Sequence, residues 1–471
     1  LLGRQSLQAP LLDVAIDLNG KELQMYNGPN SYNLTVQGGR LYRSSLNTQG
    51  FSTLSMGYGS YLYNVTGEDI ELTGPALIYQ GVSFQNLTLS YEGSINAWTG
   101  GTYDLTINQD LVCYGIIAIE PTGNIYLRLY GDLYNYGIIA TYYVYFMGTG
   151  TQQLYHDPSA APFLNNTLGK PSSVTSGQVV LLSDLRAMDT MIDMNGRNLI
   201  CHSSGTPRSI SLVGGFIYRC NLITSGFSTL MMDGGAYLYN VTAGDFILQG
   251  TVMVYYGVSF DDVVNQGTLQ SWYGINNLSI NGDLHNWAQI SENAGSNLYL
   301  HLKKDIFNRG NTSCAQIHFD GPANQTLQLV QGYNFGAQNI FLISNWGNAQ
   351  FWLYDVLVYQ GNTYYDIDTA TPGIWTIVAG TQQRTVSILP ATGSPLPQPQ
   401  ITDISIQDEF VTVTWNEVPG AYYYLLQEAS DPYVVFSDYY YVWDDQPGDG
   451  VVSYHAPVVL PRRFYKVIAL D

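Results

Sequence analysis

The chain has 471 residues and a mass of 52.2 kDa, more than one compact core usually holds, so its length predicts several domains or an elongated repeat architecture. Its 17 Lys and Arg against 37 Asp and Glu give a net charge of −20, which excludes the basic surface of a nucleic-acid-binding protein. The 45% hydrophobic content, with 39 Tyr and 48 Gly, excludes a disordered acidic tail. No apolar run is long enough for a membrane span, and no basic segment precedes an apolar stretch at the N-terminus, so we expect a mature, soluble protein without a retained signal peptide.

The first part of the chain is a tandem duplication. The pentapeptide that begins at Ile16 returns with one change at Ile192. Further matches follow at the same separation, and after a short deletion they resume at a slightly smaller one, where Asp132 and its neighbours correspond to Asp305 and its neighbours. Internal repeats of this kind are the signature of a stacked architecture, so we predict two copies of one repeat unit.

Each copy consists of short apolar segments rich in β-forming residues, spaced by about 18 residues. Gly or Asn-Gly turns separate most of these segments, and helical periodicity is missing. The pattern predicts an all-β fold whose main part is a right-handed parallel β-helix, in which each coil stacks its strands in parallel on the coil before.

The C-terminal segment differs in pattern. The run from Phe410 to Trp415 alternates apolar and polar residues, and a similar strand around Tyr465 closes the chain, so we predict a small β-sandwich. The segment resembles a fibronectin type III or immunoglobulin-like module, with Trp415 as the inner tryptophan and Tyr465 as the late-strand tyrosine. A Pro-rich stretch before it is typical of a stiff linker. The predicted domains are residues 1–176 and 177–389 for the two solenoid copies, the second with terminal coils, residues 390–399 for the linker, and residues 400–471 for the sandwich.

The run from Phe163 to Leu185, which continues from Ile192 to Leu199, resembles the repeats of secreted bacterial surface proteins with parallel β-helix domains. The resemblance covers most of residues 1–390 and rests on the pattern of Gly, Asn and apolar positions. It implies an exported, extracellular protein that carries immunoglobulin-like modules at its C-terminus. Proteins of this class serve adhesion, surface layers and carbohydrate processing.

Several acidic residues recur between the copies, in the pairs Asp17/Asp193, Asp69/Asp245, Asp110/Asp283 and Asp132/Asp305. Polysaccharide lyases need a base and a cation beside a uronate, and glycoside hydrolases need two carboxylates at a defined separation. The recurrent acids instead lie next to turn Asn and Gly residues, and no Arg or Lys recurs beside them in the sequence. We therefore assign them to turns and predict no catalytic residue and no enzyme. The recurrent arginines, Arg43 and Arg219, are expected at exposed strand positions.

We predict neither a metal site nor a cofactor. The six His show no ligand spacing, and none recurs between the copies. Calcium held by acidic loops is the alternative interpretation. Its candidate ligands are Asp366, Asp368, Asp438, Asp444, Asp445 and Asp449.

Two of the four cysteines, Cys201 and Cys220, are separated by close to one coil of the repeat. Strands of neighbouring coils stack at about 4.8 Å, within the range that a disulfide tolerates, so a disulfide between them is one hypothesis and two buried thiols the other.

Asn-x-Ser/Thr sequons begin at Asn33, Asn64, Asn86, Asn165, Asn240, Asn277, Asn311 and Asn324. We select four of them, Asn33, Asn64, Asn86 and Asn240, as candidate glycosylation sites.

The chain opens inside a repeat unit, so we expect its first coil to lack a cap and to present unpaired strand edges. This expectation favours an extracellular or cell-surface structural protein that self-assembles into a filament or surface layer. Its partners would be copies of itself, joined as a homo-oligomer or polymer through the solenoid ends or the C-terminal module. A surface adhesin that binds glycans, for which exposed Tyr-x-Tyr strands are candidate platforms, is the first alternative. A polysaccharide lyase or glycoside hydrolase of the β-helix type is the second.

Overall fold

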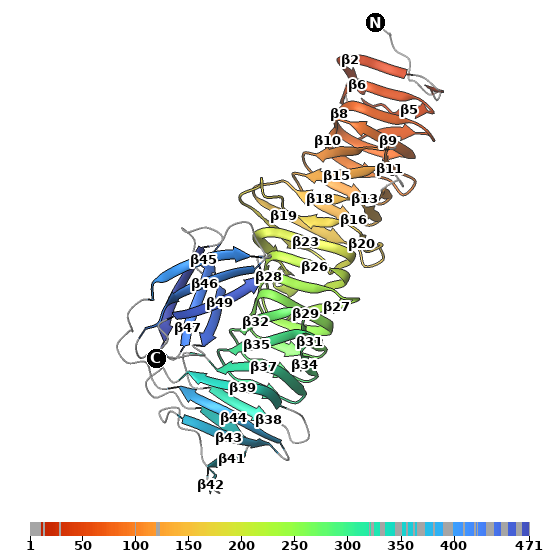
Figure 1. Cartoon of the computed structure of the whole chain (residues 1–471). Coiled ribbons are helices and arrows are strands. Elements are labelled where there is room, and N and C mark those ends of the chain that lie inside the picture. Colours follow the sequence, from red (N-terminus) through yellow and green to blue (C-terminus); the bar gives the residue numbers. More distant parts are fainter. Residues whose placement is uncertain are drawn as a thin grey trace. The chain divides into compact units, whose positions relative to one another are not determined.

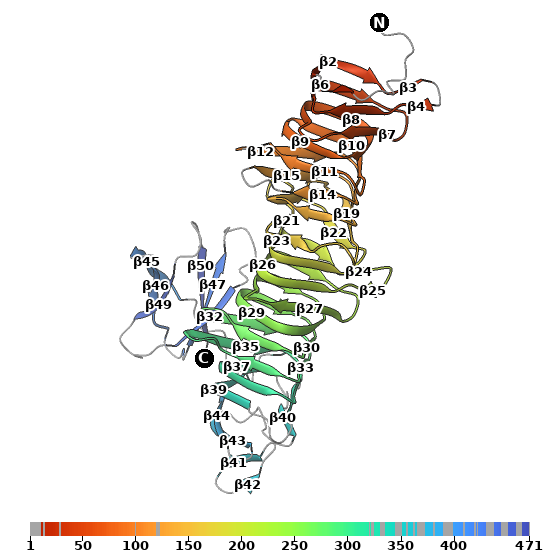
Figure 2. The same cartoon turned by 90° about the vertical axis from the view of Figure 1, so that its right-hand side faces the viewer.

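The computed structural model of the chain is all-β (Figures 1 and 2). Every regular element in the residues that the structure describes is a β-strand, and none is a helix. The described residues are 11–12, 15–27, 30–98, 100–118, 123–319, 321, 325–329, 335–343, 351–354, 357–360, 363–364, 373–379, 382–389, 399–407, 410–418, 421, 423–429, 438–443, 451–457 and 464–470. The predicted fold class, a parallel β-solenoid followed by a small β-sandwich, is confirmed.

The chain divides into two compact units. The first comprises Leu1–Ala315 with Gly332–Gly336, and the second comprises Gln316–Gln331 with Ala337–Asp471. Over the residues that the structure describes, the solenoid has about 14 turns.

The strands of the first copy are β1 (Leu11–Leu12), β2 (Ala15–Gln24), β3 (Tyr26–Asn27), β4 (Asn30–Ser31), β5 (Leu34–Gln37), β6 (Arg40–Asn47), β7 (Ser52–Met56), β8 (Tyr61–Thr73), β9 (Pro75–Gln80), β10 (Val82–Leu89), β11 (Ser94–Ala97), β12 (Thr102–Ile107), β13 (Leu111–Cys113), β14 (Ile116–Ala118), β15 (Asn124–Leu129), β16 (Leu133–Asn135), β17 (Ile138–Ala140), β18 (Tyr143–Phe146), β19 (Thr151–His156), β20 (Phe163–Leu164) and β21 (Thr167–Gly169). They continue as β22 (Gln178–Leu181), β23 (Leu185–Ile200), β24 (His202–Ser203), β25 (Thr206–Pro207), β26 (Ile210–Ile223), β27 (Ser228–Asp233), β28 (Tyr237–Ala243), β29 (Phe246–Phe260), β30 (Val263–Asn265), β31 (Thr268–Ser271), β32 (Gly274–Ile280), β33 (Leu284–Asn286), β34 (Gln289–Ser291), β35 (Ser296–Leu302), β36 (Ile306–Asn308) and β37 (Asn311–Phe319). The remaining strands are β38 (Gln325–Leu329), β39 (Phe335–Ile343), β40 (Phe351–Tyr354), β41 (Leu357–Gln360), β42 (Thr363–Tyr364), β43 (Gly373–Ala379), β44 (Gln382–Leu389), β45 (Ile401–Gln407), β46 (Phe410–Asn416), β47 (Tyr423–Ala429), β48 (Asp438–Trp443), β49 (Val451–Pro457) and β50 (Phe464–Leu470).

The coils of the first unit stack in parallel. β23 pairs with β26, and β26 pairs with β28, each in the same direction (Figure 1). Within a straight segment alternate residues point inward, as Ile210 and Leu212 do on β26, and both are fully buried. Burying each such side chain contributes about 1.5–3 kcal/mol, and neighbouring coils satisfy the backbone N–H and C=O groups. A single coil lacks both contributions, which is why stacking stabilises the fold.

One corner of the coil recurs with a left-handed backbone conformation in both copies. Its residues are Asn19, Arg43 and Asn64 in the first copy and Asn195, Arg219 and Asn240 in the second, with φ between 40° and 51°. Asn tolerates this conformation better than most residues, whereas Arg rarely adopts it. The next coil has glycine at this corner, and a Cβ on Gly81 would lie 2.4 Å from Asn64 Oδ1, so the column requires glycine there.

The parallel stacking changes to antiparallel pairing in the second unit. β39 pairs in parallel with β44, but β43 pairs with both β44 and β41 in antiparallel fashion. An antiparallel meander does not continue the coil, so it ends the parallel stack at β44.

The C-terminal segment forms two three-stranded antiparallel sheets, β45-β46-β49 and β48-β47-β50. Their inner faces share one core, in which Trp415 and Tyr424 are fully buried with ring centroids 5.6 Å apart. Trp415 is therefore an inner tryptophan, as expected. The side chain of Tyr465 and all of the linker except Pro399 lie outside the described residues.

Candidate functional site

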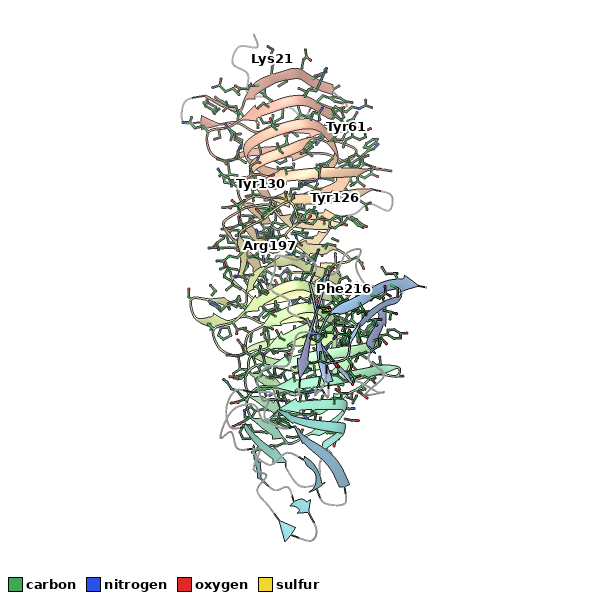
Figure 3. The ribbon with its side chains drawn as sticks, turned by 60° about the vertical axis from the view of Figure 1, so that its left-hand side comes forward. Lys21, Tyr61, Tyr126, Tyr130, Arg197 and Phe216 are labelled. Carbon is green, nitrogen blue, oxygen red and sulfur yellow. The ribbon has the colours of Figure 1, made fainter. Side chains whose placement is uncertain are left out.

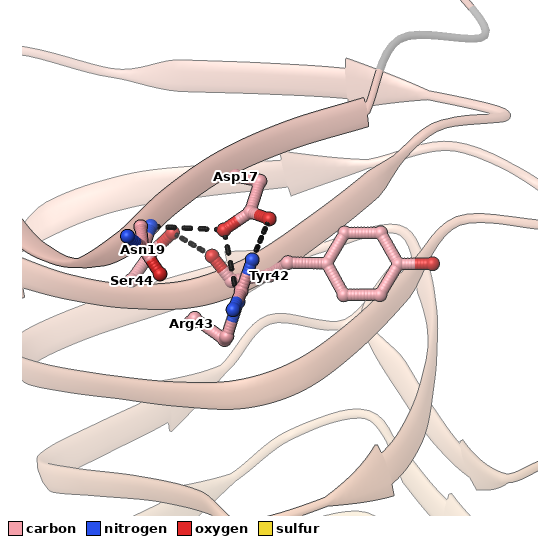
Figure 4. Close-up of polar contacts among 5 residues, drawn as sticks. All are labelled: Asp17, Asn19, Tyr42, Arg43 and Ser44. Carbon is pink, nitrogen blue, oxygen red and sulfur yellow. Dashed lines mark hydrogen bonds and ion pairs between the residues drawn. The ribbon is translucent and has the colours of Figure 1, made fainter.

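Asp17 and Arg43 come together at the left-handed corner of the first copy (Figure 4). Arg43 Nε donates to Asp17 Oδ1 at 3.1 Å, and its Nη2 donates to Oδ2. The backbone N–H of Asn19 also donates to Asp17 Oδ1, at 2.9 Å. These hydrogen bonds, that from Arg43 first, lower the pKa of the Asp17 carboxyl.

The second copy repeats this arrangement. Arg219 Nε donates to Asp193 Oδ1 at 3.2 Å, and the backbone N–H of Asn195 donates to the same oxygen at 2.8 Å. No arginine recurs beside these acids in the sequence, but the fold brings Arg43 to Asp17 and Arg219 to Asp193, because one coil places residues 26 positions apart in contact. Each of these carboxylates is held by a two-point guanidinium contact within the coil wall.

The other recurrent acids lie in a column of turn residues, which Asp262 completes in the second copy and Asn86 in the first. In the second copy Asp262 N donates to Asp245 Oδ1 at 3.1 Å, Asp283 N to Asp262 Oδ1 at 2.7 Å, and Asp305 N to Asp283 Oδ1 at 3.1 Å. In the first copy Asp132 N donates in the same way to Asp110 Oδ1 at 2.9 Å. Each contact joins a turn carboxylate to the backbone of the next coil, which is the chemistry of turn residues.

Cys201 and Cys220 lie on successive coils but out of register. Cys220 pairs with Arg197, while the backbone N–H of Cys201 donates to Ile223 O at 2.7 Å. The local coil, which runs from Arg197 to Cys220, is therefore longer than the spacing of the two cysteines. Both thiols are buried and reduced in the structure, and burial raises the pKa of the Cys201 thiol to about 12. The disulfide stays a prediction.

The candidate glycosylation sites differ in their surroundings. Asn33 and Asn64 are exposed, and Asn240 is half-buried. Asn86 Nδ2, the atom that would carry the sugar, donates to Asp69 Oδ1 at 2.7 Å and to Gln109 Oε1 at 2.9 Å. Glycosylation at Asn86 would remove at least one of these bonds, so the other three positions are better acceptors.

Aromatic rings pack on one another along the outer side of the solenoid, where Figure 3 labels Tyr61, Tyr126 and Phe216. The same ring contacts occur in both copies. The matched pairs are Tyr42–Tyr63 and Tyr218–Tyr239, Tyr63–Tyr79 and Tyr239–Tyr255, and Tyr61–Trp98 and Tyr237–Trp272, with ring centroids 5.1–5.6 Å apart. Burial, together with the hydrogen bond to Tyr42, raises the pKa of Tyr61 to about 12. These side chains form a ladder of aromatic rings on the outer side of the solenoid, and both copies have it.

A second ladder places one tyrosine on each of four successive coils. Tyr91, Tyr114, Tyr136 and Tyr155 follow one another with ring centroids 5.0, 4.8 and 5.2 Å apart. The Tyr114 and Tyr136 rings are nearly parallel, at 17°, so they cover each other's faces. A sugar ring stacks on an aromatic face, and in this ladder Tyr91 is 79% exposed, whereas Tyr114, Tyr136 and Tyr155 are half-buried.

The first coil differs from its counterpart in the second copy in how well it is covered. Ile192, Met194 and Leu199 are 1–2% exposed, because the strands β21 and β22 stack on β23. The equivalent residues of β2, listed in the same order, are Ile16, Leu18 and Leu23, and all three are half-exposed. β2 pairs with β6 along one edge, and the described pairings place no strand on its other edge. The apolar side chains of β2 are therefore more exposed than their counterparts on β23.

A buried polar ladder escaped the sequence analysis. Asn265 Nδ2 donates to Asn286 Oδ1 at 2.8 Å, and Asn286 Nδ2 donates to Asn308 Oδ1 at 2.7 Å, with all three residues at most 1% exposed. The signal was present as an apolar-x-Asn tripeptide, which ends β30, β33 and β36 and, in the first copy, β16 at Asn135.

Lys170, between the two copies, was also missed. It is 1% exposed, and its Nζ donates to Gly148 O at 2.7 Å and to Gln152 Oε1 at 3.1 Å. Burial, with a smaller effect from Arg197, lowers its pKa to about 8. Nothing in the sequence distinguishes this lysine from an exposed one.

Within the described part of the chain no group of three or more His, Cys, Asp or Glu is placed to hold a metal ion. The side chains proposed for calcium, from Asp366 to Asp449, lie outside that part. A search of the described residues finds no helix long and apolar enough to cross a membrane.

No family model, curated protein or solved structure matches this chain.

Proposed function

We propose that the chain is an extracellular structural protein that self-assembles into a filament or surface layer through its solenoid. The observation that carries the proposal is the difference between β2 and β23. β2 and the last ten residues of β23 share five identical residues, and the apolar residues buried on β23 are half-exposed on β2. A coil with this pattern gains stability when another coil covers it, by about 25 cal/mol for each Å² of apolar surface buried.

The use of the side chains supports the same proposal. Most rings of the Tyr91–Tyr155 ladder cover one another and stiffen the stack instead of facing solvent. The recurrent carboxylates accept hydrogen bonds from the backbone or from arginine. The extracellular location is supported by the resemblance to exported surface proteins and by the presence of only five lysines.

The experiment is size-exclusion chromatography with light scattering over a range of concentrations, followed by electron microscopy without added ligand. Polymers are expected from the native chain and strongly reduced polymers from Ile16→Asp. Ile116→Asp is the matched control, because Ile116 is a 40% exposed isoleucine of β14, a strand paired on both edges. A chain that stays monomeric at every concentration would contradict the proposal.

Glycan binding is a second proposal, favoured by Trp272 and Tyr273, which are 36% and 65% exposed on neighbouring positions. Binding of dispersed monomers to a glycan array, lost in Tyr273→Ala and retained in Tyr58→Ala, would support it. Tyr58 is 93% exposed and serves as the control for loss of an exposed ring. Equal binding by both variants and the native chain would overturn it.

A further inference from the structure

We propose that the Tyr91–Tyr155 ladder is a site of oxidative cross-linking, in which a peroxide-dependent one-electron oxidation enters at Tyr91 and joins Tyr114 to Tyr136 by a carbon–carbon bond. The product is a dityrosine that ties one coil of the solenoid to the next. The modification lies within one molecule, so it goes beyond the proposed self-assembly and does not depend on it.

Tyr114 and Tyr136 are the best-stacked pair of the ladder. Their ring centroids are 4.8 Å apart and their ring planes differ by 17°, whereas the other two contacts of the ladder are tilted by 39° and 42°. Both side chains are half-buried. The two phenol rings therefore face each other across neighbouring coils, which is the arrangement that coupling of two phenoxyl radicals requires.

The backbone beneath these rings positions them next to each other. Tyr136 N donates to Cys113 O at 2.8 Å, and each of the two tyrosines is followed by a glycine. A Cβ on Gly137 would lie 2.1 Å from Gly115 O, so the two turns stack too closely for a side chain between them. The glycines thus bring the tyrosines of successive coils together.

The second copy builds the same turn without these tyrosines. In place of the last three tyrosines of the ladder it has Trp287, Arg309 and Gln328. A Cβ on Gly310 would lie 2.0 Å from Ala288 O, as close as the corresponding contact in the first copy. Stacking of the coils at this turn therefore does not require tyrosine, and oxidation of the phenol is the chemistry that the stacked tyrosines share.

Tyr91 gives an oxidant access to the ladder. Its side chain is 79% exposed, and its ring centroid lies 5.0 Å from that of Tyr114. A large oxidant that cannot reach the half-buried rings can take an electron and a proton from Tyr91, and rings in contact pass the oxidation inward. Two successive oxidations place one radical on Tyr114 and one on Tyr136.

The step balances with hydrogen peroxide and a haem peroxidase as the oxidant. Tyr114 and Tyr136 each lose one electron and one proton, and the two phenoxyl radicals couple through a ring carbon beside each phenol oxygen. The hydrogen on each coupled carbon then moves to the phenol oxygen, which restores both aromatic rings. The electrons and protons removed from the pair reduce one hydrogen peroxide to two water molecules.

The first test treats dilute native protein with a haem peroxidase and hydrogen peroxide and maps the peptides of the monomer fraction. We expect dityrosine fluorescence and a linked pair of peptides that contains Tyr114 and Tyr136 and has lost two hydrogen atoms. Tyr136→Phe should abolish this pair, because Phe keeps the ring and its stacking but has no phenol to oxidise. Tyr134→Phe is the matched control and should keep the cross-link, since Tyr134 is a half-buried tyrosine of the same coil outside the ladder.

The second test measures how fast the cross-link forms with the peroxidase. Tyr91→Phe is expected to slow it severalfold, because Phe cannot receive the oxidation and pass it to Tyr114. Tyr58→Phe should leave the rate unchanged, since Tyr58 is 93% exposed but does not belong to the ladder. Equal rates for Tyr91→Phe and the native chain would overturn the entry of the oxidation at Tyr91.

The third test measures the effect of the cross-link on stability. The new bond closes a loop of the unfolded chain between the two tyrosines, which lowers the entropy of the unfolded state. The oxidised native chain should therefore unfold at a higher urea concentration than the untreated chain, while oxidation should leave the midpoint of Tyr136→Phe unchanged. An equal rise in both proteins would contradict the assignment of the stabilising bond to this pair.

Two results of the peptide map would refute the cross-linking site itself. One is a linked pair formed only by Tyr143 and Tyr145, whose rings stack at 4.7 Å and 21° on a single strand. The other is dityrosine found only between molecules, with none in the monomer fraction.

Discussion

Replacing Asn286 by alanine is expected to cost about 3 kcal/mol of unfolding free energy. The amide of Asn286 makes three close side-chain hydrogen bonds, with Asn308 at 2.7 Å, Asn265 at 2.8 Å and Thr312 at 3.1 Å. A buried hydrogen bond contributes about 1 kcal/mol net, so the loss of three such bonds costs about 3 kcal/mol.

The partners of Asn286 are not left without hydrogen bonds in this variant, which keeps the cost from rising further. Asn265 Nδ2 also donates to Gln289 O at 2.9 Å, and Asn308 Oδ1 also accepts from Thr312 Oγ1 at 2.9 Å. The estimate therefore contains the three lost bonds and no penalty for a stranded side-chain group, while the Ala288 N–H loses its long contact of 3.4 Å with Asn286 Oδ1.

The first copy provides a matched control. Cys113 occupies the position equivalent to Asn286, and its Sγ contacts only Gly115 O, at 3.6 Å, among the hydrogen bonds that the structure shows. Cys113→Ala removes a similar volume without the amide network, so it is expected to cost about 1 kcal/mol, the transfer and cavity cost of one small group. Asn286→Cys should fall between the two.

The assay is urea unfolding followed by circular dichroism, with hydrogen exchange of Leu284–Asn286 as a local readout, because a chain with two units need not unfold in one step. The reasoning is refuted if Asn286→Ala changes the free energy of unfolding by less than about 0.5 kcal/mol, the range of ordinary surface substitutions. Equal losses for Asn286→Ala and Cys113→Ala would show that packing, not the amide ladder, determines the stability of this column.

Burial, with a smaller effect from Arg186, lowers the pKa of His156 from 6.5 to about 4, so its neutral form stabilises the fold above pH 6.5. As the pH falls to 4, His156 takes up a proton in the unfolded chain before it does so in the folded chain, so the free energy of unfolding falls by about 3 kcal/mol. Urea unfolding of His156→Phe should show a smaller decrease over this pH range. Tyr424→Phe removes the phenol that accepts the Val418 N–H at 2.8 Å. It should destabilise the sandwich by about 1–3 kcal/mol in thermal unfolding, and no change would contradict the role of this bond. Arg219→Met should lower the melting temperature more than Arg43→Met, because the Asp193 side chain is 13% exposed and that of Asp17 is 39% exposed. Equal shifts would contradict the importance of burial here.

The solenoid could be predicted because a tandem repeat shows its period directly. The recurrence of the Ile16 pentapeptide at Ile192 marked the copies, and the parallel pairing of β23 with β26 confirms the stacking that the pattern indicated. The buried Trp415 likewise followed from the alternation along β46.

The contacts between coils were harder to predict because the number of residues per coil varies. The spacing of Cys201 and Cys220 matched an average coil, but the β24–β25 hairpin lengthens the local coil and moves the two thiols out of register. The pairing of Asp17 with Arg43 was missed for the same reason, since their separation of 26 residues exceeds the average period. The end of the parallel stack at β44 depends on a change of strand direction that leaves no periodic trace in the sequence.

The small hairpins at one corner have a practical consequence. β24 and β25 project between Cys201 and Arg208, yet Arg208 N donates to Cys201 O at 2.8 Å, so the chain closes the corner beneath the hairpin. The first copy carries β3 and β4 at the same place. A guest peptide inserted at the tip of the β24–β25 hairpin would be displayed on the side wall without altering the stack, and a polymer built from such chains would repeat that guest at regular intervals along its length.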